Sequence, residues 1–406
     1  MKIVQINVTN KIGSTGKIMD DLDKEIRKHG YHGYKVCAYT TDYIDENLYC
    51  TNKGNYIWSV KKDIAISRVT GITGHRYKHE TRKVVQWLEK IRPDIIHLHN
   101  IHGDWINLKI LFQYIKKNSI PIVWTLHDCW AFTGRCSHFE MCGCDKWKTG
   151  CYECTNNKVY PITYFFDFSK KMWKEKKELF NGLDCRIVVP SAWLENYVKD
   201  SFLNNYPVHV IHNGIDTDIY THRKVESNTK KIVLGVANSW SKNKGFDDFI
   251  QLSEKLNPNE YQIMMVGLNE EQIKKIPKSI IGIKRTNNQQ ELADIYSAAD
   301  VFVNPTYQDN YPTTNLEAIA CGTLAITYNT GGSPESMISN EYVFEKGDID
   351  GLYNIIVAVC NKKPYTTEFL QDYAKRKFDK SITVQEYIRL YEDILKADGT
   401  KEVGIR

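Results

Sequence analysis

The stretch DNYPTTNLEAIACG, residues 309–322, carries the side chains whose types and spacing point to binding chemistry. It follows a short apolar run typical of a buried strand, and its two threonines open a predicted helix. The first N–H groups of a helix lack partners within it, and its dipole favours negative charge there. Yet two carboxylates, Asp309 and Glu317, bracket this anion-binding position. The ligand should therefore be anionic in its middle and rich in hydroxyl groups on both sides.

A nucleoside diphosphate sugar has that distribution of groups. We expect Glu317 to accept hydrogen bonds from ribose hydroxyls and Asp309 to accept them from the sugar, because carboxylates are strong acceptors. The diphosphate should lie at the start of the helix. The N–H groups expected to hold it lie within the segment formed by Asn310, Tyr311, Thr313 and Thr314.

Six of the eleven cysteines fall between Cys129 and Cys154. Cys151 and Cys154 have the spacing of a zinc knuckle, and Cys136 with Cys144 supplies an upstream pair, with Cys142 as the alternate. Disulfides are disfavoured in the cytosol, which favours a metal. The pattern therefore predicts a structural zinc site, with free thiols as the alternative, at Cys136, Cys144, Cys151 and Cys154.

These residues are positioned by strands and helices that alternate almost throughout. Apolar runs such as 94–100, 121–128 and 300–306 predict strands, and amphipathic runs such as 16–30 and 245–257 predict helices. Apolar strands separated by helices indicate parallel sheets covered on both faces. We therefore expect an α/β protein with two doubly wound, Rossmann-like domains, in which ligands bind at the carboxyl ends of the strands.

Changes in composition suggest the domain boundaries. We predict an N-terminal domain at 1–206 with a cysteine-rich insert at 129–160, and a polar linker at 207–228 that contains Pro207 and Gly214. The second domain should span 229–375. A final helical segment at 376–406 should cross back to the first domain.

Composition excludes several classes of function. The chain has 406 residues, 42% hydrophobic and 25% charged, as in soluble globular proteins, and a net charge of only +5. This mild charge predicts no strong electrostatic footprint on nucleic acid and speaks against a nucleic-acid binder. The first residues form a strand pattern rather than a signal peptide, and no apolar run reaches the roughly 20 residues of a membrane span. We expect a cytoplasmic protein.

A glycine-containing turn, KIGSTGK, follows the first predicted strand. Gly13 and Gly16 are too close together for a Walker loop, and no dinucleotide fingerprint is present. The turn can hold a phosphate or hydroxyl of the ligand, or it can simply connect strand and helix. The histidines at the predicted strand ends, His97, His99 and His102, can likewise bind a metal or take part in ordinary backbone hydrogen bonds.

The segment at 309–335 resembles the donor-binding signature of family 4 glycosyltransferases, which are retaining enzymes of the GT-B fold. Asp309 takes the position of the first acid of that signature, where Glu is usual, and Glu317 takes the second. VHVIHNGIDTDIY, which contains Asn213, resembles the linker of the family. VANSWSKNKGFDDFI resembles its phosphate-binding turn. Similar motifs cover nearly the whole C-terminal half.

The resemblance implies roles for further residues. Lys244 would contact the donor phosphates, and Lys242 would supply the second charge, because Ser239 stands near the position where the family has Arg. His127 and Asp128 resemble the T-x-H-D motif of the family. His127 would hydrogen-bond the donor sugar or its leaving phosphate, and Asp128 would orient the imidazole. The predicted catalytic residues are therefore His127, Asp128 and Asp309, without a catalytic metal.

The resemblance also implies transfer, with retention of configuration, to a glycan acceptor that we expect to be polyprenyl-linked. The cysteine-rich stretch resembles an insert found in enzymes of capsular and exopolysaccharide synthesis. The aromatic and lysine-rich segment at 164–180 suggests contact with the inner membrane surface, or else a solvated basic helix face. Two alternatives stay open: a nucleotide-sugar epimerase of the same fold, and a zinc-dependent nucleic-acid-binding protein.

Overall fold

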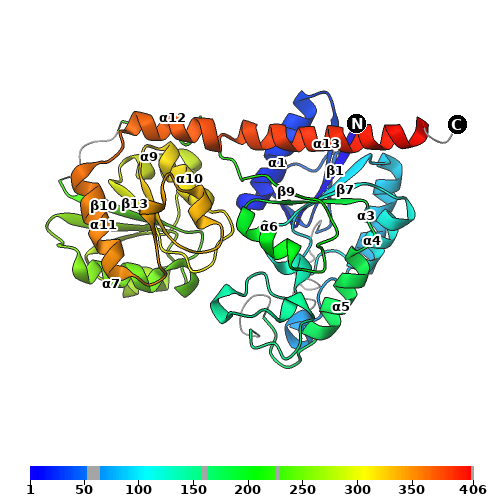
Figure 1. The fold of residues 1–406 in the computed structure, drawn as a ribbon, viewed down its shortest axis with the longest axis horizontal. Helices are drawn as coiled ribbons and strands as arrows, with labels where there is room; N and C mark the ends of the chain where they lie inside the picture. Colours follow the sequence, from blue (N-terminus) through cyan, green and yellow to red (C-terminus); the bar gives the residue numbers. More distant parts are fainter. Residues whose placement is uncertain (53–64, 157–161, 225–228, 404–406) are drawn as a thin grey trace. The chain divides into compact units, whose positions relative to one another are not determined.

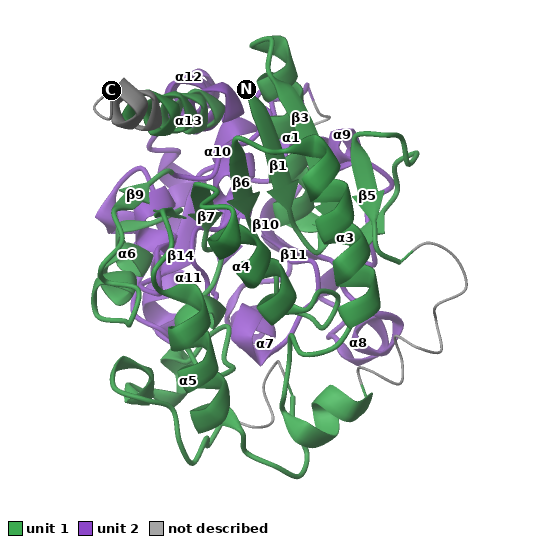
Figure 2. Cartoon of the chain, turned by 90° about the vertical axis from the view of Figure 1, so that its right-hand side faces the viewer, with its two compact units in different colours: residues 1–211, 384–406 green, residues 212–383 purple. Residues whose placement is uncertain are grey.

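The structure is a computed structural model that describes residues 1–52, 65–156, 162–224 and 229–403 (Figure 1). The chain divides into two compact units. Unit 1 comprises residues 1–211 and 384–406, and unit 2 comprises residues 212–383 (Figure 2). Parts of two predicted regions, 157–160 of the cysteine-rich insert and 225–228 of the linker, lie outside the described residues.

Unit 1 is built on a parallel sheet of seven strands in the order β5-β3-β1-β6-β7-β8-β9. The central strands are buried along their whole length, which explains their near-continuous apolar sequences. The strands are β1 (Lys2–Ile6), β3 (His32–Cys37), β5 (Leu48–Cys50), β6 (Ile95–Leu98), β7 (Ile122–Thr125), β8 (Cys185–Val189) and β9 (Val208–Val210).

The start of the predicted linker is thus part of the sheet. β9 pairs with β8 as an edge strand, with Ile187 opposite Val208. A strand of three residues with a histidine in its centre carries too little periodicity to be recognised in the sequence. A second, two-stranded sheet joins β2 (Thr9–Asn10) to β4 (Tyr39–Thr40).

Helices cover both faces of the unit 1 sheet (Figure 1). On one face, Leu22 and Ile26 of α1 (Gly13–Lys28) and Tyr391 of α13 (Lys380–Val403) pack against β-strand residues such as Ile3 and Val123. The opposite face is covered by α3 (Lys78–Ile91), α4 (Leu108–Lys117), α5 (Ser169–Phe180) and α6 (Ala192–Lys199).

Unit 2 has a parallel sheet of six strands in the order β12-β11-β10-β13-β14-β15. The strands are β10 (Lys231–Val236), β11 (Tyr261–Val266), β12 (Ile280–Ile283), β13 (Val301–Asn304), β14 (Ala325–Tyr328) and β15 (Val343–Phe344). The helices of this unit are α7 (Phe246–Lys255), α8 (Glu270–Lys275), α9 (Gln289–Ser297), α10 (Thr313–Ala320), α11 (Ile349–Lys362) and α12 (Thr367–Phe378).

The prediction of two doubly wound, parallel-sheet units is confirmed. Each parallel sheet gathers the carboxyl ends of its strands at one edge, where ligands bind in this architecture. In unit 1 this edge holds the segments after β1, β6 and β7. In unit 2 it holds the segments after β10 and β13.

Candidate active site

The predicted anion-binding position of unit 2 lies where the loop after β13 leads into helix α10. Helix α10 begins at Thr313, directly after Pro312, and among the described residues no side chain caps its first turn. Thr313 and Thr314 are half-buried, whereas Asn310 and Tyr311 are buried. The start of α10 therefore combines a favourable dipole with N–H groups that lack a side-chain acceptor.

A charged pair lies beside this helix start. The ammonium group of Lys244 is 2.6 Å from Oδ2 of Asp309, whose Oδ1 accepts a hydrogen bond from the N–H of Asn310 at 3.0 Å. Lys244 ends a 3-10 turn (Lys242–Lys244), in which Lys242 is exposed. From the sequence, Lys244 was expected to contact the phosphates and Asp309 the sugar. In the structure the two side chains form an ion pair with each other.

Two glycines allow this close arrangement. Gly245 follows Lys244 with a φ of +74°, and a Cβ there would lie 2.3 Å from the carbonyl oxygen of Pro305. A Cβ on Gly331, whose φ is +58°, would lie 1.7 Å from the carbonyl oxygen of Asp309. Any side chain at either position would displace the loop that carries Asp309.

Glu317 lies in the second turn of α10, among tyrosines. The hydroxyl of Tyr296 on α9 donates to Oε2 of Glu317 at 3.1 Å, and Gln289 donates to the hydroxyl of Tyr220 at 3.3 Å. Burial, followed by the charge of Glu317, raises the pKa of both Tyr220 and Tyr296 above the usual range. These tyrosines therefore stay protonated and can donate to a charged carboxylate.

A buried amide network anchors α10, and the sequence did not reveal it. Asn315 accepts a hydrogen bond from Asn304 of β13 at 2.9 Å and donates to Ser336 at 2.8 Å. Asn213 reaches the same loop, where it donates to the carbonyl oxygen of Tyr311 at 3.3 Å. An asparagine in an otherwise apolar helix, at a position facing the core, is the signal that could have identified this network.

The glycine turn of unit 1 begins helix α1. Gly13 has a φ of +68°, which favours glycine. A Cβ on Gly16 would lie 3.0 Å from Oγ1 of Thr9 and 3.1 Å from the backbone N of Lys11. Close packing of β2 against α1 therefore accounts for Gly16, and its role in ligand binding stays a prediction.

His127 lies just beyond the carboxyl end of β7. Its Nε2 is 3.2 Å from Nδ1 of His99, which follows β6. Burial lowers the pKa of His127 to about 4, because the effect of His102 adds to that of burial and Asp128 opposes it only in part. His127 is therefore neutral near pH 7 and can act in hydrogen bonding.

The role of Asp128 in orienting His127 stays a prediction. Its Oδ2 lies 3.1 Å from Nε2 of His102, and its Oδ1 accepts from the backbone N–H of Trp130 at 2.8 Å. Burial raises the pKa of Asp128, but His102 outweighs it, so that the pKa falls to about 2. Both residues lie in the bend that follows β7, where the side chains are not held in the alternation of a strand.

The zinc site expected in the cysteine-rich segment stays a prediction. Cys136, Cys144, Cys151 and Cys154 line one small pocket. However, within the described ranges no group of three or more His, Cys, Asp or Glu side chains is arranged to hold a metal ion. Sulfur atoms of the segment bond locally instead: Cys151 accepts from the N–H of Gly134 at 3.1 Å, and Cys142 donates to the carbonyl of Phe139 at 3.1 Å. Among the described residues, His97, His99 and His102 likewise belong to no group arranged to hold a metal ion.

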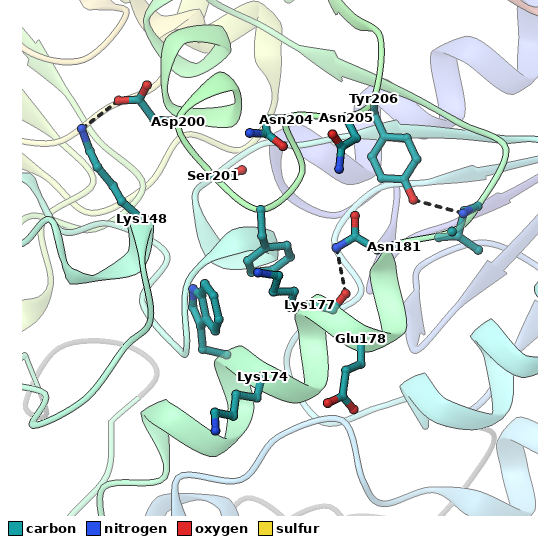
Figure 3. A pocket seen from close by; sticks show the side chains of 14 residues that line it. Lys148, Lys174, Lys177, Glu178, Asn181, Asp200, Ser201, Asn204, Asn205 and Tyr206 are labelled. Atoms are coloured by element: carbon teal, nitrogen blue, oxygen red, sulfur yellow. Dashed lines mark hydrogen bonds and ion pairs between the residues drawn. The ribbon is translucent and has the colours of Figure 1, made fainter.

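A hollow of about 950 Å³ lies elsewhere in unit 1 (Figure 3). It is formed by the end of α5 and by the segments that precede β8 and β9, and thus lies toward the amino ends of these strands. An ion pair of 2.7 Å between Lys148 and Asp200 lies at its border. No predicted site residue lines it, so we do not assign the candidate site there.

Comparison with known proteins now identifies the family. The model of the family described as Glycosyltransferase Family 4 matches residues 58–219, and that of Glycosyl transferases group 1 matches residues 219–377. A putative colanic acid biosynthesis glycosyl transferase, WcaC of Escherichia coli, is 26% identical over 268 residues. The alignment covers 60% of this chain and 62% of the E. coli protein, less than two thirds of the length of that relative.

Solved structures show the same fold. Sucrose-phosphate synthase from Thermosynechococcus elongatus superposes with a TM-score of 0.72 at 16% identity, covering 98% of this chain and 100% of that one. Anabaena HepE in complex with UDP-glucose gives a TM-score of 0.62 at 16% identity, with the same coverage. These likenesses establish the GT-B fold. The two adjoining family matches, which together span residues 58–377, identify the chain as a glycosyltransferase of family 4.

Proposed function

We propose that this glycosyltransferase takes its sugar from a nucleoside diphosphate sugar and transfers it, with retention, to a glycan acceptor in cell-surface polysaccharide synthesis. The arrangement around the start of α10 carries the proposal: Lys244 and Asp309 lie on one side of the helix start, and Glu317 lies one turn further along. The similarity to a protein of colanic acid biosynthesis supports the polysaccharide.

The residues divide the ligand among themselves by charge. The diphosphate is anionic and fits the helix start together with the ammonium of Lys244, which moves from Asp309 to the phosphate. Asp309 then accepts from sugar hydroxyls, and Glu317, steadied by Tyr296, accepts from ribose hydroxyls. The helix dipole and Lys244 stabilise the leaving diphosphate. In the retaining scheme that the family resemblance implies, the leaving phosphate accepts the proton of the incoming hydroxyl.

A thermal-shift comparison tests the donor assignment. UDP, GDP, ADP and dTDP, each with its sugars, are added to the wild-type protein and to Glu317→Gln. At a concentration of 100 times Kd, a ligand stabilises the fold by about 2.7 kcal/mol, which raises Tm by about 2–4 °C. We expect one nucleotide class to raise Tm, and Glu317→Gln to reduce this shift. Glu270→Gln, in an exposed ion pair with Lys284, is the matched control.

Equal stabilisation of Glu317→Gln and the wild type by every nucleotide would refute the binding site. With the donor known, NMR of the product determines the anomeric configuration, and an inverted product would refute retention. An epimerised free sugar nucleotide formed without acceptor would instead favour the epimerase.

We further propose that the acceptor is lipid-linked and that unit 1 meets the membrane through an aromatic and cationic surface. This surface consists of Tyr164, Phe165 and Phe166, which are 61%, 76% and 55% exposed, and of the exposed lysines of α5, Lys170, Lys171 and Lys174. Three consecutive exposed aromatic rings beside lysines suit the interface of an anionic bilayer. In the described part of the chain, no helix has the length and apolarity needed to cross a bilayer.

Flotation with vesicles tests the membrane surface. The wild-type protein should float with vesicles that contain anionic lipid and remain unbound with purely zwitterionic ones. Replacement of Lys170, Lys171 and Lys174 by Glu should abolish flotation, whereas the same change at Lys375 and Lys377 of α12 should not. Undiminished flotation of the α5 variant would refute this contact.

A further inference from the structure

Buried polar side chains line the sheet face that α1 and α13 cover in unit 1. Gln5 on β1, His97 on β6 and His99 just after it have exposed fractions of 0%, 0% and 1%. Gln5 pairs in register with His97. His97 and His99, and likewise Thr125 and His127, alternate with apolar residues and therefore share this face. Buried polar groups need hydrogen-bond partners, so the partners of these side chains show which of their nitrogen atoms carry a proton.

The orientation of the Gln5 amide is fixed at one end. Its Nε2 is 3.0 Å from the carbonyl oxygen of Met19 on α1, which can only accept a hydrogen bond. The amide oxygen of Gln5 therefore faces Nε2 of His99, at 3.3 Å. The reverse orientation would place two acceptor oxygens against each other.

The proton positions of the two histidines follow from this orientation. Because Oε1 of Gln5 can only accept, Nε2 of His99 carries the hydrogen. A neutral imidazole has one N–H, so Nδ1 of His99 is an acceptor and Nε2 of His127, 3.2 Å away, must be the donor. In neutral His127 the other nitrogen, Nδ1, then carries no proton.

Both rings are neutral near pH 7. Burial lowers the pKa of His99 well below its usual range, with His97 and His127 adding to the effect. The nearby carboxylate of Asp128 bonds to His102 and offsets the effect of burial on His127 only in part. The hydrogen bonds from Gln5 through His99 to His127 form a relay. His97 is not part of it, since its two nitrogens face the hydroxyls of Tyr391 and Thr125 at 2.6 and 2.8 Å.

We propose that Gln5 and His99 are positioning residues that hold His127 in its Nε2–H tautomer and so make Nδ1 the hydrogen-bond acceptor of this ring. The catalytic importance of this tautomer rests on the proposed function, in which His127 contacts the ligand. A ligand atom bonded to Nδ1 of neutral His127 must then be a donor, such as a sugar hydroxyl. A phosphate oxygen, which is an acceptor, does not fit.

NMR of the protein labelled with ¹⁵N-histidine tests the relay directly. Long-range ¹H–¹⁵N correlations distinguish the two tautomers, and loss of signals in His127→Gln assigns the ring. At pH 7.5 we expect the Nε2–H form for both His99 and His127. In Gln5→Met, which removes the amide, the Nδ1–H form of His127 should gain population. Thr125→Val, which removes a buried hydroxyl bonded to His97, should leave the spectrum of His127 unchanged.

Kinetics show whether the tautomer matters for transfer. We expect Gln5→Met to lower kcat by about 10- to 100-fold, the usual cost of losing an orienting partner, with KM for the donor within about threefold. Thr125→Val should keep kcat within about threefold. If Gln5→Met does not fold, His99→Asn replaces it, because an asparagine amide can take the place of Nδ1 but cannot reach Gln5.

Three results would overturn the proposal: wild-type His127 in the Nδ1–H form, a variant spectrum identical to that of the wild type, or a variant kcat equal to that of the wild type. The NMR result requires no turnover and is thus independent of the proposed reaction. A normal rate for His127→Gln would refute the role of His127 in transfer, whereas the tautomer measurement would still decide the relay.

Discussion

At the carboxyl edge of the unit 2 sheet the candidate residues are charged and half-buried, whereas those of unit 1 are buried or half-buried and, apart from Asp128, neutral. Lys244, Asp309 and Glu317 illustrate the first kind, and His99 and His127 the second. Burying a charge without a partner is costly, so a group inside a sheet must work through hydrogen bonds. The charged side chains of unit 2 therefore suit an anionic ligand, while the neutral imidazoles of unit 1 offer hydrogen-bond donors and acceptors in fixed directions.

The largest effect should come from removing the cation of unit 2. Lys244→Met should lower kcat/KM by about 10²–10³-fold, the range for losing one group that stabilises developing charge. Steady-state kinetics with the identified donor provide the measurement. Lys255→Met is the matched control, because Lys255 forms an ion pair of 2.7 Å with Asp350 on the surface of the same unit. A loss below threefold would remove Lys244 from the site and end the contrast in charge.

The buried histidines of unit 1 should make its stability depend on pH. Burial lowers the pKa of His97 to about 3 and that of His127 to about 4, below the value of 6.5 for an exposed histidine. Between pH 4 and 6.5 the unfolded state therefore binds more protons, so that stability falls as the pH decreases through this window. We expect the free energy of unfolding to be lower at pH 5 than at pH 7.5 by about 2 kcal/mol for each histidine that stays neutral in the folded state.

Urea unfolding followed by tryptophan fluorescence measures this effect. Every tryptophan except Trp240 lies within residues 1–211, so the signal reports mainly on unit 1. His127→Gln should flatten the dependence on pH, since one of the titrating groups is gone. The same slope in variant and wild type would show that His127 is not held neutral, and the contrast between the units would weaken.

The features that the sequence could predict are local. Apolar runs such as 301–303 marked buried strands, and the threonines before an apolar helix marked the start of α10, within one element each. The parallel arrangement followed because strands and helices alternate. Asp309 and Glu317 could be placed near one helix start because only eight positions separate them along the chain.

The pairing of side chains across elements could not be predicted. His99 meets Gln5 across 94 positions, and Lys244 meets Asp309 across 65. Such contacts depend on which strands are neighbours and on their register, which spacing along the chain does not contain. Asp128 shows the result: the sequence suggested its immediate neighbour His127 as its partner, and the structure adds a bond to His102, which follows a different strand. Polar residues alternating within buried strands were the unused signal.

A smaller effect should follow from removing the hydroxyl that supports Glu317. Tyr296→Phe leaves the ring but deletes the donor to Oε2, and we expect a donor Kd about tenfold higher, since hydrogen bonds to charged groups contribute about 1.5–3 kcal/mol. Tyr261→Phe, buried in the same unit, is the control. In the double variant with Glu317→Gln the two losses should not add. Additive losses would mean that Tyr296 acts independently of Glu317.

The smallest expected effect concerns the metal content of unit 1, where the structure and the sequence lead to different expectations. Cys136 bonds with Cys154, while Cys151 and Cys142 bond to the backbone, so the thiols form local contacts rather than a tetrahedral set. From this arrangement we expect well below one zinc per chain in protein purified with reductant and without chelator, measured by elemental analysis. Cys151→Ser should leave the ratio unchanged. One zinc per chain that is lost in this variant would confirm the four-thiolate site, and would give unit 1 a charged centre of its own. The contrast between the two units would then hold only for the residues at the carboxyl edges of their sheets.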